Sequence, residues 1–394
     1  MGSRRRSALR RHARQALSLS LAVAGIACGG ERSADDPSGL SVDPTPVVSI
    51  GVEEGEEPYQ LDRVFDALVT ADGRIVVSNS SSSELRVFDS SGTYLSTIGR
   101  RGAGPMEFAE FSQGRLHLNA NQVLAVDEGA FRVHILSPDL EYRETRRFTL
   151  YPDTPRPFFR GLAPNGEWIA QAFTGGGTLR GAPGQVLQSS YQMMRYDSLG
   201  AMQDSIIALP SRTRIVNEHQ GSVHFPYLPL SAEPLVAVDG DRLIIVAGNA
   251  PALEIHGIDG TLRAQHVWNR PRVRVGDIWD EWKRQSAVAM TGQRDSARYA
   301  DFHDKAIPLP EFAPLYVGVQ VDPAGRIWLE RFRMPLDSVR RWDVLDADGS
   351  LLGAAETPRD VTVLRFARDL LVGRHRDSLG VERVQLHRVR TEDR

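Results

Sequence analysis

The residues that could carry chemistry in this chain do not group into a known catalytic pattern. Its ten histidines are scattered, and the closest pair, His219 and His224, lacks the i, i+4 spacing of zinc ligands on a helix. The run Gly175–Gly177 is not followed by Gly-Lys-Ser or Gly-Lys-Thr, so it is not a phosphate-binding loop. No serine lies in a Gly-x-Ser-x-Gly elbow. The sequence therefore carries no enzyme signature.

A second set of polar residues would meet at one place if the strands that follow them surround a common channel. Enzymes built this way, of the lactonase or lyase type, hold a divalent metal with acids, Asn or His that converge on the channel. The set mixes charges and contains neither His nor Asn, so we expect no metal and no cofactor. These candidate channel-mouth residues are Asp62, Arg63, Glu110, Arg160, Glu233 and Tyr316.

The elements that would position these residues are repeated β-strands. The stretch from Asp72 to Phe108 predicts three short strands with a turn after each, and weaker copies recur down the chain. Each copy has an Asp/Asn-Gly type turn between its inner strands, then an apolar strand that ends in Asp before a second Gly turn. In the first copy these are Asp72-Gly73, then Leu85–Asp89 with Gly92. We interpret each copy as one blade of a β-propeller.

Six such units are present, and their strand content predicts how the ring closes. The sixth unit stops after three strands, the last at Val381–Val389, while the chain's first strand, Val47–Gly51, has no unit of its own. That strand would pair on the outside of blade 6 and leave no open edge. We predict an all-β fold over residues 47–394, a six-bladed β-propeller closed by an N-terminal strand.

Blades 3 and 4 are the longest units, and their extra residues are expected to form loops. Gly175–Pro183 and the proline-rich Ser211–Pro234 both have loop composition. Because the other sites have simpler structural explanations, specific chemistry is expected in such irregular parts.

A short helical insert is predicted at residues 276–310, before blade 5. Asp277–Thr291 has helical spacing with Asp277 as its N-cap, and a second helix is expected over Gln293–Asp304. Trp279 and Trp282 could form a binding patch, but we expect at least one of them to fasten the insert to the ring.

Residues 1–27 have the composition of a bacterial signal peptide. Six arginines precede the apolar run Ala16–Ala27, which is too short to span a bilayer as a helix. The sequence Gly25-Ile26-Ala27-Cys28 resembles a lipobox and predicts lipid attachment at Cys28, the only cysteine. Residues 28–46 are rich in Gly, Ser, Asp and Pro and are expected to be a disordered tether. The alternative is a plain secretory signal that leaves Cys28 unpaired.

The overall composition is that of a soluble globular protein, with 41% hydrophobic and 25% charged residues. Removal of the first 27 residues, with their six arginines and no acid, would take the formal net charge from −3 to near −9. An acidic chain is poorly suited to the phosphate backbone, so no nucleic-acid partner is expected.

Blades 1 and 2 carry a resemblance to a known family. Leu85–Asp89 with Gly92, followed by Ile98–Phe108, resembles NHL-type repeats and in particular the exported six-bladed β-propeller proteins of bacteria. Val126–Val133 is similar to the same repeat, with Phe131 where Asn is more usual. The resemblance implies the fold but little about activity, because propellers include both enzymes and binding platforms.

The most family-like segment, Arg100–Phe108, has two interpretations. Its charged residues, including Arg101 and Glu107, could line a face of the ring. The simpler interpretation is structural, with Gly102, Gly104 and Pro105 shaping the crossing between blades while Phe108 fills the space between them.

We therefore expect a monomeric binding or scaffolding propeller that is exported and lipid-anchored in the cell envelope, at the outer membrane or cell surface, or else secreted or periplasmic. Propeller faces are broad and built of loops, which suits a protein, peptide or glycan partner. The alternative is a metal-assisted lactonase or lyase that acts at the central channel. Since no catalytic set is visible, we favour the binding module over the enzyme.

Overall fold

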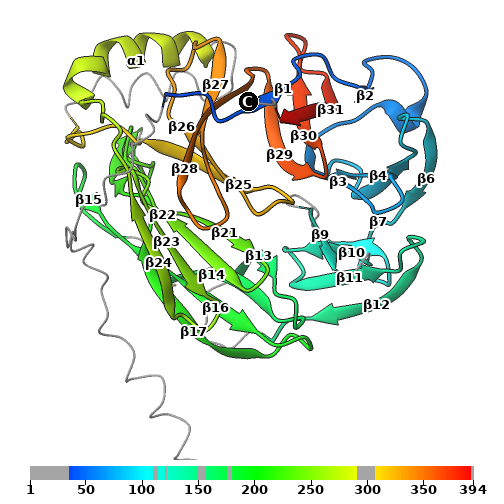
Figure 1. The fold of residues 1–394 in the computed structure, drawn as a ribbon. Coiled ribbons are helices and arrows are strands. Elements are labelled where there is room, and N and C mark those ends of the chain that lie inside the picture. The colour runs from blue at the N-terminus through cyan, green and yellow to red at the C-terminus, as the bar shows by residue number, and fades with distance from the viewer. Residues whose placement is uncertain are drawn as a thin grey trace, which may run out of the picture.

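The structure is a computed structural model, and it describes residues 35–109, 114–119, 122–149, 157–174, 180–219, 221–290 and 307–391. Six antiparallel sheets surround a central axis (Figure 1), so the predicted six-bladed β-propeller is confirmed. The inner strands of neighbouring blades contact one another around the whole ring, and the inner strand of blade 6 also contacts that of blade 1. The ring is therefore closed.

The blades follow the order of the sequence. Blade 1 contains β3 (Val64–Val69), β4 (Ile75–Asn79), β5 (Glu84–Phe88) and β6 (Tyr94–Ile98). Blade 2 contains β9 (Arg115–Asn119), β10 (Gln122–Asp127), β11 (Arg132–Leu136) and β12 (Tyr142–Arg147). Blade 3 contains β13 (Pro157–Leu162), β14 (Trp168–Thr174), β16 (Ser190–Tyr196) and β17 (Met202–Pro210).

The second half of the ring repeats this pattern. Blade 4 contains β21 (Leu235–Asp239), β22 (Arg242–Val246), β23 (Ala252–Gly257) and β24 (Leu262–Val267). Blade 5 contains β25 (Tyr316–Val321), β26 (Ile327–Arg331), β27 (Val339–Leu345) and β28 (Leu351–Pro358). Blade 6 contains β29 (Val361–Ala367), β30 (Leu370–Arg376) and β31 (Glu382–Thr391).

Two N-terminal strands complete blade 6. The predicted closing strand is β2 (Val48–Ile50), which pairs antiparallel with β31. A further strand, β1 (Leu40–Val42), pairs with the C-terminal part of β31. The expected tether over residues 28–46 is therefore shorter, because its second half belongs to the propeller; Cys28 lies outside the described residues.

The core lies between the blades rather than inside any one of them. Six apolar clusters each join side chains of two neighbouring blades. A blade in a ring is covered on both faces, so its middle strands are buried on both sides, as in β4, where all five residues are buried and the first three are apolar. Each buried Val, Leu or Ile contributes about 1.5–3 kcal/mol, so the seams between blades hold most of the stability.

The turn glycines identified from the sequence have the expected backbone. Gly73, between β3 and β4, has φ of 92°, and Gly92, between β5 and β6, has φ of 90°. Residues with a Cβ rarely adopt these angles, so glycine is favoured at these positions and the turns could be predicted from the sequence.

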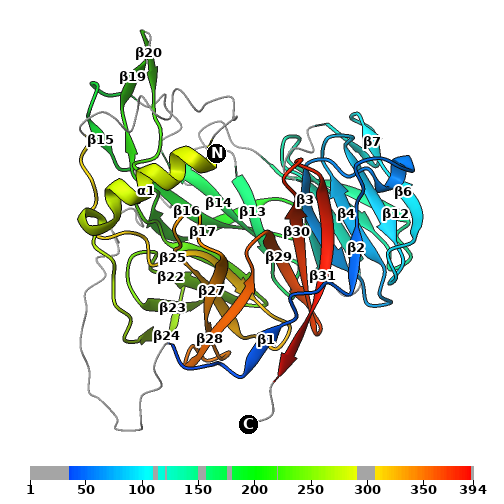
Figure 2. The same cartoon turned by 90° about the horizontal axis from the view of Figure 1, so that it is seen from above.

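The added segments of blade 3 are not entirely loops, contrary to expectation. Ser211–Pro234 includes the short hairpin of β19 (Asn217–His219) and β20 (Ser222–His224), and β15 (Val186–Leu187) pairs with β18 (Arg214–Ile215). Pairings of two or three residues carry almost no periodicity, so composition alone could not reveal them. The run Gly175–Gly177 lies outside the described residues. Figure 2 shows β15, β19, β20 and α1 gathered on one side of the ring.

The predicted insert contains one described helix, α1 (Val275–Ala289). Its N-cap is Arg274 without a side-chain cap, so Asp277 lies in the first turn and is not the cap we predicted. Trp279 and Trp282 stack at 5.5 Å and pack with Leu230 and Val275, as an anchor should. The second predicted helix, Gln293–Asp304, lies outside the described residues. Within the described ranges, no helix has the length and apolar character needed to cross a membrane.

Two smaller elements lie between blades 6, 1 and 2. A 3₁₀ helix, η1 (Glu57–Tyr59), precedes blade 1. The strands β7 (Arg100–Arg101) and β8 (Glu107–Phe108) form a short parallel pair in the crossing from blade 1 to blade 2.

Candidate functional site

The predicted channel-mouth residues do not form one site. Asp62 and Arg63 are exposed before β3, where the Asp62 backbone N–H donates to Asn79 Oδ1 at 2.8 Å. Glu110 lies outside the described residues. Tyr316 is buried, at 1% exposure, so it cannot meet a ligand in the channel. Arg160 and Glu233 lie within electrostatic range of each other.

Arg160 lies on β13 and is held by its own blade. Its Nε donates to Gln171 Oε1 at 2.7 Å, and its Nη2 donates to the same oxygen. Burial, together with the neighbouring Arg115, lowers the pKa of Arg160, and the negative charges of Glu128 and Glu233 act in the opposite direction. Arg160 is therefore a partly buried cation whose nearest hydrogen-bond acceptor is neutral.

Other charged residues on the inner strands join the blades together. Arg365 of β29 donates to Asp66 Oδ2 on β3 at 2.5 Å and to the Leu116 carbonyl on β9 at 2.8 Å, so it connects blades 6, 1 and 2. Arg115 forms an ion pair with Glu128 at 3.4 Å, and burial raises the pKa of the Glu128 carboxyl. These charged groups therefore hold neighbouring strands and blades together.

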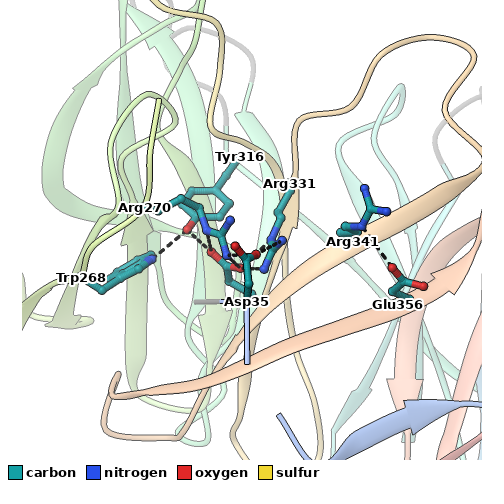
Figure 3. Close-up of polar contacts among 8 residues, drawn as sticks. Asp35, Trp268, Arg270, Tyr316, Arg331, Arg341 and Glu356 are labelled. Atoms are coloured by element: carbon teal, nitrogen blue, oxygen red, sulfur yellow. Dashed lines mark hydrogen bonds and ion pairs between the residues drawn. The ribbon is translucent and has the colours of Figure 1, made fainter. Parts of the chain in front are cut away.

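Tyr316 belongs to a polar cluster between blades 4 and 5 that the sequence did not reveal (Figure 3). The Tyr316 hydroxyl donates to Asp343 Oδ2 and accepts a hydrogen bond from Trp268 Nε1 at 2.9 Å. Burial, and next the Asp343 charge, raise the pKa of Tyr316 above its ordinary value. The phenol therefore stays protonated and acts as a donor.

Two arginines neutralise the buried Asp343. Arg270 Nε donates to Asp343 Oδ2 at 2.7 Å, and Arg331 Nε donates to Asp343 Oδ1 at 2.6 Å. Both guanidinium groups also reach Asp35 Oδ1, at 3.3 and 3.0 Å, so the N-terminal segment covers this cluster. The Arg270 charge holds the pKa of Asp35 below its usual value. Figure 3 also shows a separate pair, Arg341 with Glu356, that is exposed to solvent.

The crossing between blades 1 and 2 is tied down by Arg132. Its Nη1 donates to the Ala103 carbonyl at 2.8 Å, and its Nη2 donates to the Glu107 and Gly102 carbonyls at 2.5 and 3.1 Å. Its Nε donates to Asp127 Oδ2 at 3.0 Å; Arg132 is 1% and Asp127 0% exposed. Phe108 is fully buried between the two blades. The geometry thus favours the structural interpretation of Arg100–Phe108.

A cavity of about 420 Å³ lies between the edges of blades 3 and 4, in the irregular part of the molecule. Its walls come from the end of β17, the loop before β21, the end of β22, the start of β23, and the chain that follows the insert. Twenty residues line it: Gln188, Leu209, Pro210, Ser211, Thr213, Leu228, Ser231, Ala232, Glu233, Pro234, Ile245, Ala247, Gly248, Asn249, Ala252, Leu253, Glu254, Gln265, Pro310 and Phe312.

A close backbone approach fixes the position of Glu233 in this wall. The main chain of Glu233 packs so tightly on Gly248 that a Cβ at residue 248 would collide with the Glu233 carbonyl oxygen. The Gly248 carbonyl in turn accepts a hydrogen bond from the Leu315 N–H at 2.7 Å, at the start of blade 5. The Tyr191 hydroxyl donates to the Pro234 carbonyl at 3.2 Å. The loop that carries Glu233 is therefore held from both neighbouring blades.

The two acids of the cavity differ in their partners. Glu254 Oε2 lies 2.8 Å from His256 Nε2, and its other oxygen accepts a longer contact of 3.4 Å from Gln265. Glu233 is half-buried, and within the described part of the chain its carboxylate has neither a hydrogen bond nor an ion pair. Burial, and next the Glu233 charge, raise the pKa of the neighbouring Tyr191. The cavity thus contains one carboxylate whose acceptor capacity is unused.

No group of three or more His, Cys, Asp or Glu side chains in the described ranges could hold a metal ion. His219 and His224 lie on the two strands of the β19–β20 hairpin but are not paired with each other. The metal-assisted alternative therefore stays a prediction without an assigned ligand set.

Comparison with known proteins agrees with the fold. Residues 63–162 match the family model DUF5128, described as a 6-bladed beta-propeller. No curated protein matches the sequence significantly. The chain is thus a six-bladed β-propeller protein, as the resemblance implied.

Similar solved structures are distant in sequence. A candidate exported protein from Bacteroides fragilis is 12% identical, covering 92% of this chain and 98% of its own, with a TM-score of 0.48. A DUF4221 family member from Bacteroides vulgatus is 10% identical, covering 89% and 99%, with a TM-score of 0.47. Virginiamycin B lyase from Staphylococcus aureus is 8% identical, covering 89% and 99%, with a TM-score of 0.42.

Proposed function

We propose that this propeller is exported, is anchored in the cell envelope through a lipid on Cys28, and binds a protein, peptide or glycan there as a monomer. The observation that carries the binding proposal is the cavity of about 420 Å³ between blades 3 and 4. Export and anchoring rest on the signal-like residues 1–27 and the lipobox-like Gly25-Ile26-Ala27-Cys28.

The size and lining of the cavity suit a binding site. Ligand sites are concave, enclose roughly 300–1,000 Å³, and are mostly apolar with a few placed polar groups. Eleven of the twenty lining residues are apolar, and serine, threonine, asparagine and glutamine side chains supply most of the polar atoms. A side chain of a peptide or a small part of a glycan would find both apolar contact and hydrogen-bond partners there.

Blocking the cavity tests the binding proposal. Ala232 lines the cavity from a loop, so Ala232→Trp should fill the space without disturbing a strand. The matched control is Leu199→Trp, at a residue that is 78% exposed in a turn of blade 3. Purified protein is incubated with envelope extract, and the captured molecules are identified by mass spectrometry. We expect Ala232→Trp to lose partners that the wild type and Leu199→Trp retain; an identical set for all three would contradict a function at this cavity.

Cell fractionation tests the anchor independently. We expect the full-length protein to fractionate with membranes and the Cys28→Ser variant to become soluble after export. A Cys28→Ser variant that still fractionates with membranes would refute the lipid anchor without affecting the binding proposal.

A further inference from the structure

We infer that the ligand of the blade 3–4 cavity carries a cationic nitrogen, an ammonium or guanidinium group, on an apolar body. This inference deepens the proposed function and rests on it. It follows from the charge of the wall, the unused carboxylate of Glu233 and the apolar surface around it.

The charge of the described wall has one sign. Glu233 and Glu254 are its only charged members, and no Lys, Arg or His is among the twenty lining residues. A carboxylate in a partly enclosed space loses part of its hydration, and an opposite charge that binds there restores the lost interaction. Such a cavity discriminates against anions, because a second negative charge would be repelled at short range.

The protein's own cations leave Glu233 available. Arg160 is close enough to affect and be affected by this acid, but its Nε and Nη2 both donate to Gln171 Oε1. The hydroxyl of Tyr191, the other neighbour, donates to the Pro234 carbonyl at 3.2 Å. Among the described contacts, no donor is directed at the Glu233 carboxylate. A ligand N–H would therefore meet an acceptor without displacing an internal bond.

Glu254 contributes less to the recognition of a cation. Its Oε2 is already paired with His256 at 2.8 Å. We therefore assign Glu233 as the anchor and Glu254 as a secondary contribution to the field of the cavity. This difference supplies a matched pair of variants, because both changes remove one carboxylate from the same wall.

Apolar side chains define the rest of the ligand. Leu228 and Ile245 line the cavity together with the ring of Phe312. Arg272 already stacks on Phe312, with its guanidinium carbon 3.7 Å from the ring centroid, yet it is not part of the wall. Because a cation already lies against this ring, the ligand's charge belongs at Glu233 and its apolar part at the leucine, isoleucine and phenylalanine surface.

Matched small probes test the charge preference on the purified full-length protein. 4-Phenylbutylamine, 4-phenylbutan-1-ol and 4-phenylbutyrate share one apolar body and differ in charge. We expect calorimetry to show the amine binding about tenfold more tightly than the alcohol, as for one hydrogen bond to a charged group, and the acid binding least. Equal binding of amine and alcohol, tighter binding of the acid, or no binding of any probe would overturn the inference.

Carboxamide variants assign the preference to a residue. Glu233→Gln should abolish the advantage of the amine over the alcohol, whereas Glu254→Gln should reduce it by less. Glu53→Gln removes an exposed charge near the N-terminus and should leave the preference unchanged. If Glu233→Gln leaves the tenfold preference intact, the assignment is wrong.

Two further experiments distinguish a peptide ligand from a free amine, and failure of the charge inference from failure of the proposed function. Acetyl-Phe-Lys-amide and acetyl-Phe-Gln-amide present the same chemistry on a peptide; a larger Lys-over-Gln preference than the amine-over-alcohol preference points to a peptide ligand, and a smaller one to a free amine. If Ala232→Trp blocks all probes but charge has no effect, the cavity remains a binding site and only the charge inference fails. If envelope capture does not depend on Ala232, the proposed function fails even where the amine binds.

Discussion

The crossing between blades 1 and 2 differs from the space between blades 3 and 4 in how far its polar groups are hydrogen-bonded. At the first, Arg132 donates hydrogen bonds to the carbonyls of Gly102, Ala103 and Glu107. It also pairs with the buried Asp127. At the second, added chain leaves a cavity of about 420 Å³ and a carboxylate, Glu233, to which no described group donates a hydrogen bond. We therefore expect polar contacts to contribute more to stability at the first seam, and a ligand to bind at the second.

The length of the connection explains the contrast. Blade 1 ends at Ile98 and blade 2 begins at Arg115, whereas blade 3 ends at Pro210 and blade 4 begins at Leu235. The shorter connection forms only the β7–β8 pair in its described part, whereas the longer one forms β18, β19 and β20 and extends away from the blade edge. Loops on a rigid scaffold are where binding residues usually lie, since they vary without damage to the core.

The largest effect on stability is expected when the arginine of the crossing between blades 1 and 2 is replaced. Arg132→Met should lower the free energy of unfolding by about 3–5 kcal/mol, because it leaves Asp127 buried and charged without its main partner. Urea unfolding measures the change. Arg143→Met on the exposed strand β12 is the control and should cost little. A loss below about 1 kcal/mol for Arg132→Met would mean that this crossing does not concentrate stability.

A pH effect of intermediate size is expected from the same crossing. His134 packs against Phe108, and burial, followed by the charge of Arg132, lowers its pKa from 6.5 to about 4. The neutral form is therefore favoured by folding. Its contribution is complete above pH 6.5 and decreases as the pH falls toward 4, by up to about 3 kcal/mol at 1.36 kcal/mol per pKa unit.

Unfolding midpoints in urea, measured at several pH values in this window, test the contribution. His134→Gln keeps a polar side chain near Thr145, whose hydroxyl lies 2.8 Å from His134 Nδ1, but does not titrate. We expect this variant to lose stability less steeply than the wild type on acidification. The control, His224→Gln in the β20 hairpin, should keep the wild-type slope; an unchanged slope for His134→Gln would contradict the assignment.

The smallest effect is expected at the cavity. Glu233→Gln should change the free energy of unfolding by less than about 1 kcal/mol, because the carboxylate has no described partner to lose and gains from neutralisation of a partly dehydrated charge. Chemical denaturation beside Arg132→Met provides the direct contrast. A loss above about 2 kcal/mol would show that Glu233 stabilises the fold and would remove the distinction between the two regions.

The sequence was sufficient for the ring because local chemistry repeats. Turn glycines such as Gly73 and the apolar middle strands recur in each blade, and the missing strand of blade 6 identified the closing strand, now β2. The helix over the insert was also predicted, although its cap was not.

The contacts between distant segments could not be predicted in the same way. Leu40–Val42 lies in a stretch rich in Gly, Ser, Asp and Pro, and only its pairing with Thr391–Val389 makes it a strand. Tyr316 looked like a channel residue, because nothing local shows that its hydroxyl hydrogen-bonds to Asp343 and Trp268. The cavity depends on how four separate segments meet, which the sequence does not show. Of its two acids, only Glu233 was a candidate site residue, and it was predicted at the channel mouth instead.

The N-terminal segment that covers Asp343 also sets the reach of any anchor. Six residues lie between Cys28 and Asp35, and the seven steps from one Cα to the next span at most about 3.6 Å each in an extended chain, or roughly 25 Å in all. Asp35 is fixed to Arg270 and Arg331, at the junction of blades 4 and 5. If Cys28 is acylated, this junction cannot move farther than that from the lipid surface. The ring would then keep one side toward the membrane instead of tumbling freely, and its ligand would have to approach from the envelope space that this orientation leaves open.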